Sequence, residues 1–103
     1  ELTFLNIIFA LIDREEFYYT TFFIDKLEKL LNYQDMFAIV VLNFLRQILA
    51  YLKGEITTTE PMEEYIEMVE KLGNPTTALV LRERLEEYCL KDKKRADKQP
   101  PLT

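Results

Sequence analysis

The stretch Phe17-Tyr-Tyr-Thr-Thr-Phe-Phe23 decides between the two main kinds of fold for this chain. Its aromatic and β-branched residues are individually common in β-strands. A strand with one buried face would alternate apolar and polar side chains, but the adjacent rings at 18–19 and 22–23 would point to both sides of a sheet. The residues that follow, Asp25-Lys-Leu-Glu-Lys-Leu-Leu31, continue only a helical pattern. We therefore predict that this stretch is the first half of an α-helix.

A helical projection of this segment, at about 100° per residue, separates a broad apolar face from a mostly polar one. The predicted inner residues are Tyr19, Phe23, Ile24, Leu27, Leu30 and Leu31. The predicted outer residues are Thr21, Asp25, Lys26, Glu28 and Lys29. Two rings, Tyr18 and Phe22, also fall on the outer side, and their four-residue spacing makes them neighbours on the helix surface.

The start of this helix is predicted from Asp13 and Glu16, which have the spacing of a capping box. In that motif the Asp13 side chain would accept from the first backbone amides of the helix, and the Glu16 side chain would reach back to the amide of Asp13. Asp13 would also end a short preceding helix over residues 2–12, which is apolar on nearly every side.

Three further helices are predicted downstream. The first runs to Lys53 and is closed by Gly54, which suits a left-handed residue. The second starts at the first-turn proline Pro61 and ends at Leu72. Gly73-Asn74-Pro75 combines a stop, a cap and a first-position proline, so the last helix covers residues 75–90.

The composition agrees with a helical domain. Two glycines and four prolines in 103 residues are too few for the frequent turns of an all-β fold, and 49% hydrophobic residues exclude a disordered chain. We predict an all-α fold, a five-helix bundle of antiparallel helical hairpins, with the helix that ends at Lys53 in the centre. Residues 1–90 would form a single helical domain and residues 91–103 a flexible basic C-terminal tail.

Catalytic chemistry has few residues to draw on. The chain lacks histidine and serine, so the common general base and the Ser-His and Cys-His nucleophiles are missing. Glu63, Glu67 and Glu70 share a helix face, but one helix supplies too few converging oxygens for a cation. We therefore expect a non-enzymatic protein with no cofactor, no metal and no catalytic residue.

The single cysteine, Cys89, cannot form an internal disulfide, which favours an intracellular, cytoplasmic setting. The longest apolar run, residues 36–52, is interrupted by Asn43, Arg46 and Gln47, so no membrane span is expected.

Aromatic residues are concentrated near the amino end, where eleven of the thirteen Phe and Tyr residues lie within the first 51 positions. Five short helices would not hide all of this surface, and exposed aromatic patches are typical of binding sites. We predict a protein-binding or assembly module, an adaptor or most simply a homodimer. The expected partner-binding residues are Phe4, Ile8, Phe9, Tyr18 and Phe22. In the alternative interpretation, the first helix is packed between its neighbours inside one monomer.

A second functional hypothesis is a nucleic-acid-associated subunit. The segment around Gly73-Asn74-Pro75 has the outline of a helix-turn-helix, followed by a basic tail. Its contacts would come from Arg82, Arg84, Lys93, Lys94 and Arg95. Residues 54–90 contain nine acidic residues and three basic ones, and this excess of glutamates opposes binding to phosphates.

Overall fold

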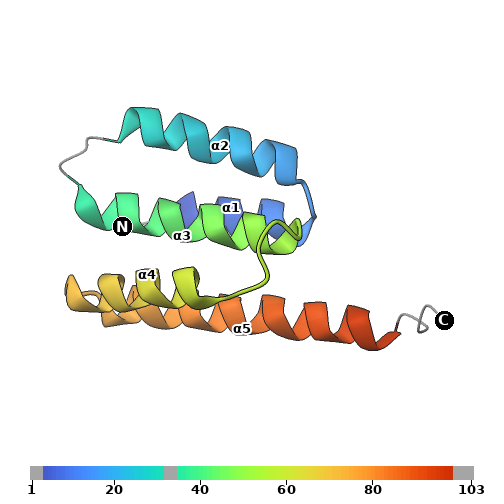
Figure 1. Cartoon of the computed structure of the whole chain (residues 1–103). Helices are drawn as coiled ribbons and strands as arrows, with labels where there is room; N and C mark the ends of the chain where they lie inside the picture. Colours follow the sequence, from blue (N-terminus) through green and yellow to red (C-terminus); the bar gives the residue numbers. More distant parts are fainter. Residues whose placement is uncertain (1–3, 32–34, 99–103) are drawn as a thin grey trace.

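The computed structural model describes residues 4–31 and 35–98, with side chains described as far as residue 90. These residues form five α-helices and no strand, which confirms the predicted all-α fold (Figure 1). The helices are α1 (Phe4–Asp13), α2 (Phe17–Leu30), α3 (Met36–Leu52), α4 (Glu60–Lys71) and α5 (Pro75–Lys98).

Consecutive helices run antiparallel, and α3 takes the central position that its sequence predicts. Figure 1 shows α2 along one edge, α4 and α5 along the opposite edge, and α3 between them, with α1 behind α3 in this view. Because α3 meets helices on several sides, eight of its residues are buried. The core is built by all five helices, and its largest fully buried side chains are Phe9, Phe44, Ile8, Ile24, Leu42, Leu45, Ile48, Met62, Ile66 and Leu81.

Two helix ends form where glycine permits a left-handed backbone. Gly54 and Gly73 have φ of 80° and 95°, and the residue after each donates its amide to a carbonyl of the preceding helix. The side chain of Asn74 then accepts from the amide of Thr77 at 3.0 Å and caps α5, with Pro75 as its first residue. The predicted boundaries at Gly54 and at 73–75 are therefore confirmed.

The connection between α1 and α2 differs from the predicted capping box. Asp13 is the last residue of α1, and Glu16 precedes α2 with no side-chain cap. The turn is made by Glu15, which adopts a left-handed φ of 59° while its amide donates to the carbonyl of Ile12. The prediction is wrong because the Asp13 carboxylate is used in a tertiary contact instead.

Helix α5 continues beyond the predicted end at Leu90 and reaches Lys98. The prediction ended the helix where apolar periodicity stops. Lysine, arginine and alanine are nevertheless strong helix formers, and bases are favoured near a helix C-terminus. Residues 91–98 therefore extend α5 rather than beginning a tail, and the prediction for residues 99–103 lies outside the described residues.

The carboxylate of Asp13 joins the first helix to the last. It accepts from Arg84 at 3.1 Å and from the hydroxyl of Tyr88 at 3.1 Å. The Arg84 guanidinium also lies over the ring of Phe9, 4.8 Å from its centre. Burial, and then the negative charge of Asp13, raise the pKa of the Tyr88 phenol above its ordinary value. The neutral phenol is therefore the donor in this contact at neutral pH.

Alkaline pH is expected to destabilise the chain through Tyr88. The unfolded phenol ionises near its ordinary pKa of 10.0, whereas the folded phenol keeps its proton. The contribution of Tyr88 to the free energy of unfolding is therefore complete below pH 10.0. Above that pH it is lost, by at most about 1.4 kcal/mol per pH unit. Urea unfolding at about pH 9 and about pH 11 measures the slope. Tyr88→Phe should reduce the slope of the unfolding free energy against pH. An unchanged slope in this variant would contradict the assignment of the pH dependence to Tyr88.

Candidate interaction surface on helix α2

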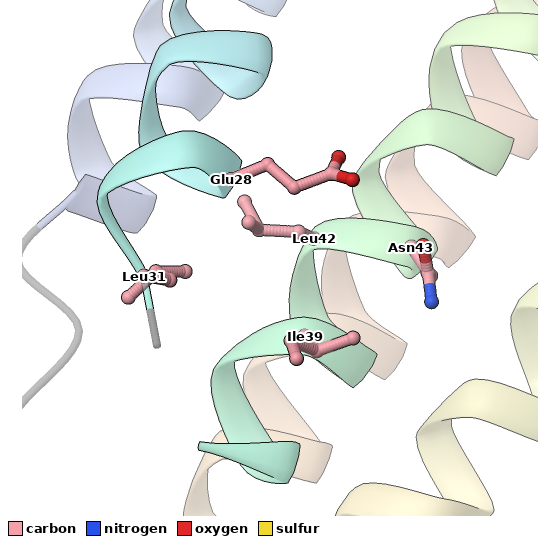
Figure 2. Close-up of a pocket in the computed structure, with 5 residues that line it drawn as sticks. All are labelled: Glu28, Leu31, Ile39, Leu42 and Asn43. Atoms are coloured by element: carbon pink, nitrogen blue, oxygen red, sulfur yellow. The ribbon is translucent and has the colours of Figure 1, made fainter. Parts of the chain in front are cut away.

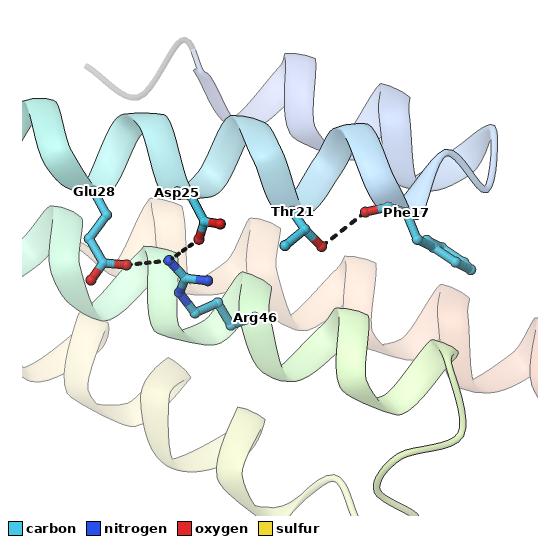
Figure 3. Close-up of polar contacts among 5 residues, drawn as sticks. All are labelled: Phe17, Thr21, Asp25, Glu28 and Arg46. Carbon is cyan, nitrogen blue, oxygen red and sulfur yellow. Dashed lines mark hydrogen bonds and ion pairs between the residues drawn. The ribbon is translucent and has the colours of Figure 1, made fainter.

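The inner side of α2 packs on α1 and α3 through Thr20 and Ile24, both fully buried. A buried hydroxyl needs a hydrogen-bond partner, and that of Thr20 donates to the carbonyl of Glu16 at 2.7 Å. Thr21 donates in the same way to the carbonyl of Phe17 at 2.9 Å (Figure 3). Because both hydroxyls are hydrogen-bonded to backbone carbonyls, threonine can occupy the inner side of α2 and the border of that side.

Arg46 of α3 fixes the flank of α2 that faces α3. Its guanidinium contacts Asp25 at 2.8 Å and also pairs with Glu28, as Figure 3 shows. Partial burial disfavours the charged guanidinium, but the hydrogen bonds to Glu28 and Asp25 outweigh it and raise the pKa of Arg46. One cation therefore holds two carboxylates of α2 against the central helix.

The outer side of α2 carries three exposed rings on two successive turns. Tyr18 is 78% exposed, Tyr19 61% and Phe22 55%. The two tyrosine rings meet edge to face with centres 5.6 Å apart, and the ammonium of Lys26 lies 5.4 Å from the centre of the Phe22 ring. We call Tyr18, Tyr19, Phe22 and Lys26 the aromatic face of α2.

The aromatic face borders an open depression of about 520 Å³ at the end of α3. Lys53 lines it, together with Thr21 and Asp25 on the flank of α2. The depression is therefore lined by both charged groups and rings.

The predicted partner-binding residues are divided by the structure. Ile8 and Phe9 are 0% and 1% exposed, and Phe4 is half-buried against the core. The prediction that α1 presents Ile8 and Phe9 to solvent is therefore wrong, and the alternative, in which α1 is covered by its neighbours, holds for them. Tyr18 and Phe22 are exposed as predicted, and their role in binding stays a prediction.

Sequence reasoning missed two exposed residues of α2, because Tyr19 and Leu30 were predicted to point inward. Tyr19 is 61% exposed and Leu30 82%. The helix is turned so that Thr20 faces the core and the flank with Asp25 faces α3. A signal was present in the sequence, since Thr20, Ile24, Leu27 and Leu31 also recur at helical spacing.

The residues proposed for nucleic-acid contacts are partly engaged within the chain. Arg84 is held by Asp13 at 3.1 Å and by Glu87 at 3.7 Å, and Arg82 lies 3.9 Å from Glu70. Lys93, Lys94 and Arg95 belong to the last turns of α5, but their side chains lie outside the described part of the chain. The structure therefore does not bring these five residues into a described basic surface.

A small cavity lies between α2 and α3, and Figure 2 shows the Glu28 side chain extending across it towards α3. Its volume is about 30 Å³, which is room for about one water molecule.

Among the described side chains, no group of three His, Cys, Asp or Glu is placed to hold a metal ion. No helix in the described ranges has both the length and the apolar character needed to cross a membrane.

Comparison with known proteins places the chain in a family. Residues 1–83 of the 103 match the C-terminal domain of the HTH-type transcriptional regulator Rgg. The chain belongs to the Rgg C-terminal domain family. The match includes the whole of α1 to α4 and the first part of α5, so the aromatic face of α2 lies within the family domain. Searches of curated proteins and of solved structures found no match.

Proposed function

We propose that this chain is a non-enzymatic protein-interaction module of an intracellular transcriptional regulator, and that its partner docks on the aromatic face of α2. The partner is a second copy of the chain or another protein. The observation that carries the proposal is the exposure of Tyr18, Tyr19 and Phe22 on two successive turns of a helix whose other side packs in the core.

Aromatic side chains supply much of the binding energy in protein interfaces, because they bury large areas and lose little side-chain entropy. Exposed apolar residues also occur on α4, on α5 and in the turn between them, but they include no ring: Met68, Leu72, Leu79 and Val80. The aromatic face is therefore the better docking site of the two.

The family supports a regulatory rather than a catalytic role. The matched domain is by name the C-terminal part of an HTH-type transcriptional regulator. A helix-turn-helix reads DNA in the major groove. We assign protein contacts rather than DNA contacts to the present helices, because Arg82 and Arg84 lie beside acidic side chains and α4 carries five glutamates.

Phe22→Lys is expected to weaken docking strongly without unfolding the chain. Burying a Phe side chain contributes about 1.5–3 kcal/mol, so binding should weaken by about ten- to a hundredfold. Folding should persist because Phe22 is already 55% exposed. Leu79→Lys is the matched control, since Leu79 is 56% exposed but lies on α5.

The three chains are compared by thermal unfolding, by sedimentation velocity and by affinity capture with a tagged chain. The proposal expects association or capture that is kept by the wild type and Leu79→Lys and lost by Phe22→Lys. Equal behaviour of all three would contradict it. Retention on DNA that weakens steeply with salt would instead support the nucleic-acid hypothesis.

A further inference from the structure

Helix α2 carries two overlapping apolar stripes, and the structure turns only one of them fully towards the core. This inner stripe consists of Thr20, Ile24, Leu27 and Leu31. An alternative stripe begins one position earlier and consists of Tyr19, Phe23, Leu27 and Leu30. Because one residue corresponds to about 100° around a helix, a rotation of α2 by about that angle would exchange the two stripes.

Hydrophobic burial by itself does not select the inner stripe. The alternative stripe has tyrosine and phenylalanine where the inner stripe has threonine and isoleucine, so it offers at least as much apolar area. Packing beside the inner stripe is also incomplete, because the cavity of about 30 Å³ between α2 and α3 is lined by Leu31, Ile39 and Leu42 (Figure 2). The observed rotation therefore calls for a further interaction that distinguishes the two stripes.

The ion pairs of Arg46 make this distinction. The guanidinium belongs to the central helix α3 and pairs with Asp25 and Glu28, on the flank of α2 that faces α3 (Figure 3). In helical projection this flank and Tyr19 lie on opposite sides of the inner stripe. A rotation that brings Tyr19 inward would therefore carry both carboxylates away from α3. The two ion pairs are compatible only with the rotation that buries Thr20 and exposes Tyr19.

We propose that Arg46 is a positioning residue for the aromatic face of α2. Its pairs with Asp25 and Glu28 select the rotation of α2 in which the three rings are exposed together. When the pairs are removed, α2 also adopts the rotation that places Tyr19 inside and Thr20 outside, and the aromatic face is dispersed. The selection of a rotation does not depend on what docks there, whereas its effect on docking rests on the proposed function.

Thiol labelling of the folded chain tests the selection. All variants carry Cys89→Ala, so that the introduced thiol is the only one. Thr20→Cys reports on the inner stripe, and Leu30→Cys gives the labelling rate of an exposed thiol on the same helix. Arg46→Glu repels both carboxylates and should raise the labelling rate at position 20 by about tenfold. Arg46→Gln only removes the ion pairs and should raise this rate by less.

Two controls separate rotation of α2 from a general loss of stability. Val69→Cys places a thiol at a fully buried position of α4, where labelling requires wider opening of the core. Arg82→Gln removes an arginine that pairs with Glu70 of α4 and should leave position 20 protected. Reversing all three charges, with Arg46→Glu, Asp25→Lys and Glu28→Lys together, should restore that protection.

Faster labelling at position 20 with position 69 still protected, and recovery in the charge-reversed chain, would support the inference. Unchanged labelling at position 20, or an equal rise at position 69, would overturn it and leave the proposed function standing. Docking is measured in the same chains, and Phe22-dependent capture should weaken from wild type to Arg46→Gln to Arg46→Glu. Capture that Arg46→Glu does not weaken would overturn the positioning role. The predicted labelling without any Phe22-dependent capture would support the selection by Arg46 and overturn the proposed function.

Discussion

Phe9→Ala is expected to lower the free energy of unfolding by about 3–5 kcal/mol, the range for removing a buried Phe side chain. Phe9 is 1% exposed and belongs to the core, and its ring also lies beneath the guanidinium of Arg84. Truncation would leave a cavity between α1 and its neighbours. Since domains of this size are stable by about 5–15 kcal/mol, the variant should be largely destabilised. Urea unfolding followed by circular dichroism measures the change.

The matched control is Phe22→Ala, which removes the same atoms from an exposed site. Phe22 is 55% exposed and contacts Lys26, so the expected loss is about 1 kcal/mol or less. Phe9 and Phe22 were both predicted to belong to one binding surface. The two variants show whether their contributions to stability differ. Similar losses for both variants would contradict the burial that the structure gives them.

Asp13→Ala is expected to cost about 1–3 kcal/mol of stability, because it removes the acceptor of a buried hydroxyl. Tyr88 is 2% exposed, and its hydroxyl donates to Asp13 at 3.1 Å. The same substitution removes the ion pair with Arg84, which is partly exposed and so contributes less. The free energy of unfolding measures the loss.

A double-mutant cycle isolates the contact between Asp13 and Tyr88. In the Tyr88→Phe background no hydroxyl is left without a partner, so Asp13→Ala should cost less there than in the wild type. Asp13→Asn keeps an oxygen acceptor but loses the charge, and should fall between the wild type and Asp13→Ala. An equal cost of Asp13→Ala in both backgrounds would show that the hydrogen bond does not couple the two residues.

Most helix boundaries could be predicted because the responsible interactions are local. Gly54 and Gly73 adopt the left-handed backbone that glycine permits, and Asn74 caps the helix that starts beside it. The turn at Glu15 could not be predicted in this way, since a left-handed glutamate carries no sequence signal. The end of α5 was placed too early because apolar periodicity reports packing against the core, whereas a helix can continue past the core on propensity alone.

The candidate site was predicted only in part. Tyr18 and Phe22 were placed correctly on the outer side of α2, because a helical projection points them away from Leu27 and Leu31. Tyr19 was missed, since a helical projection reports relative directions on one helix but not how that helix is rotated against its neighbours. The pairing of Arg46 with Asp25 and Glu28, from different helices, is part of what fixes that rotation.

The all-α fold and the central position of α3 could be predicted from periodicity, caps and glycine stops, which act within a few residues. Which aromatic residues are exposed depends on how the helices pack in three dimensions. Phe9 and Phe22 have the same side chain in similar helical surroundings, yet one is covered by distant elements and the other is not. Burial depends on those distant neighbours, such as Arg84 over Phe9, and local sequence carries no record of them.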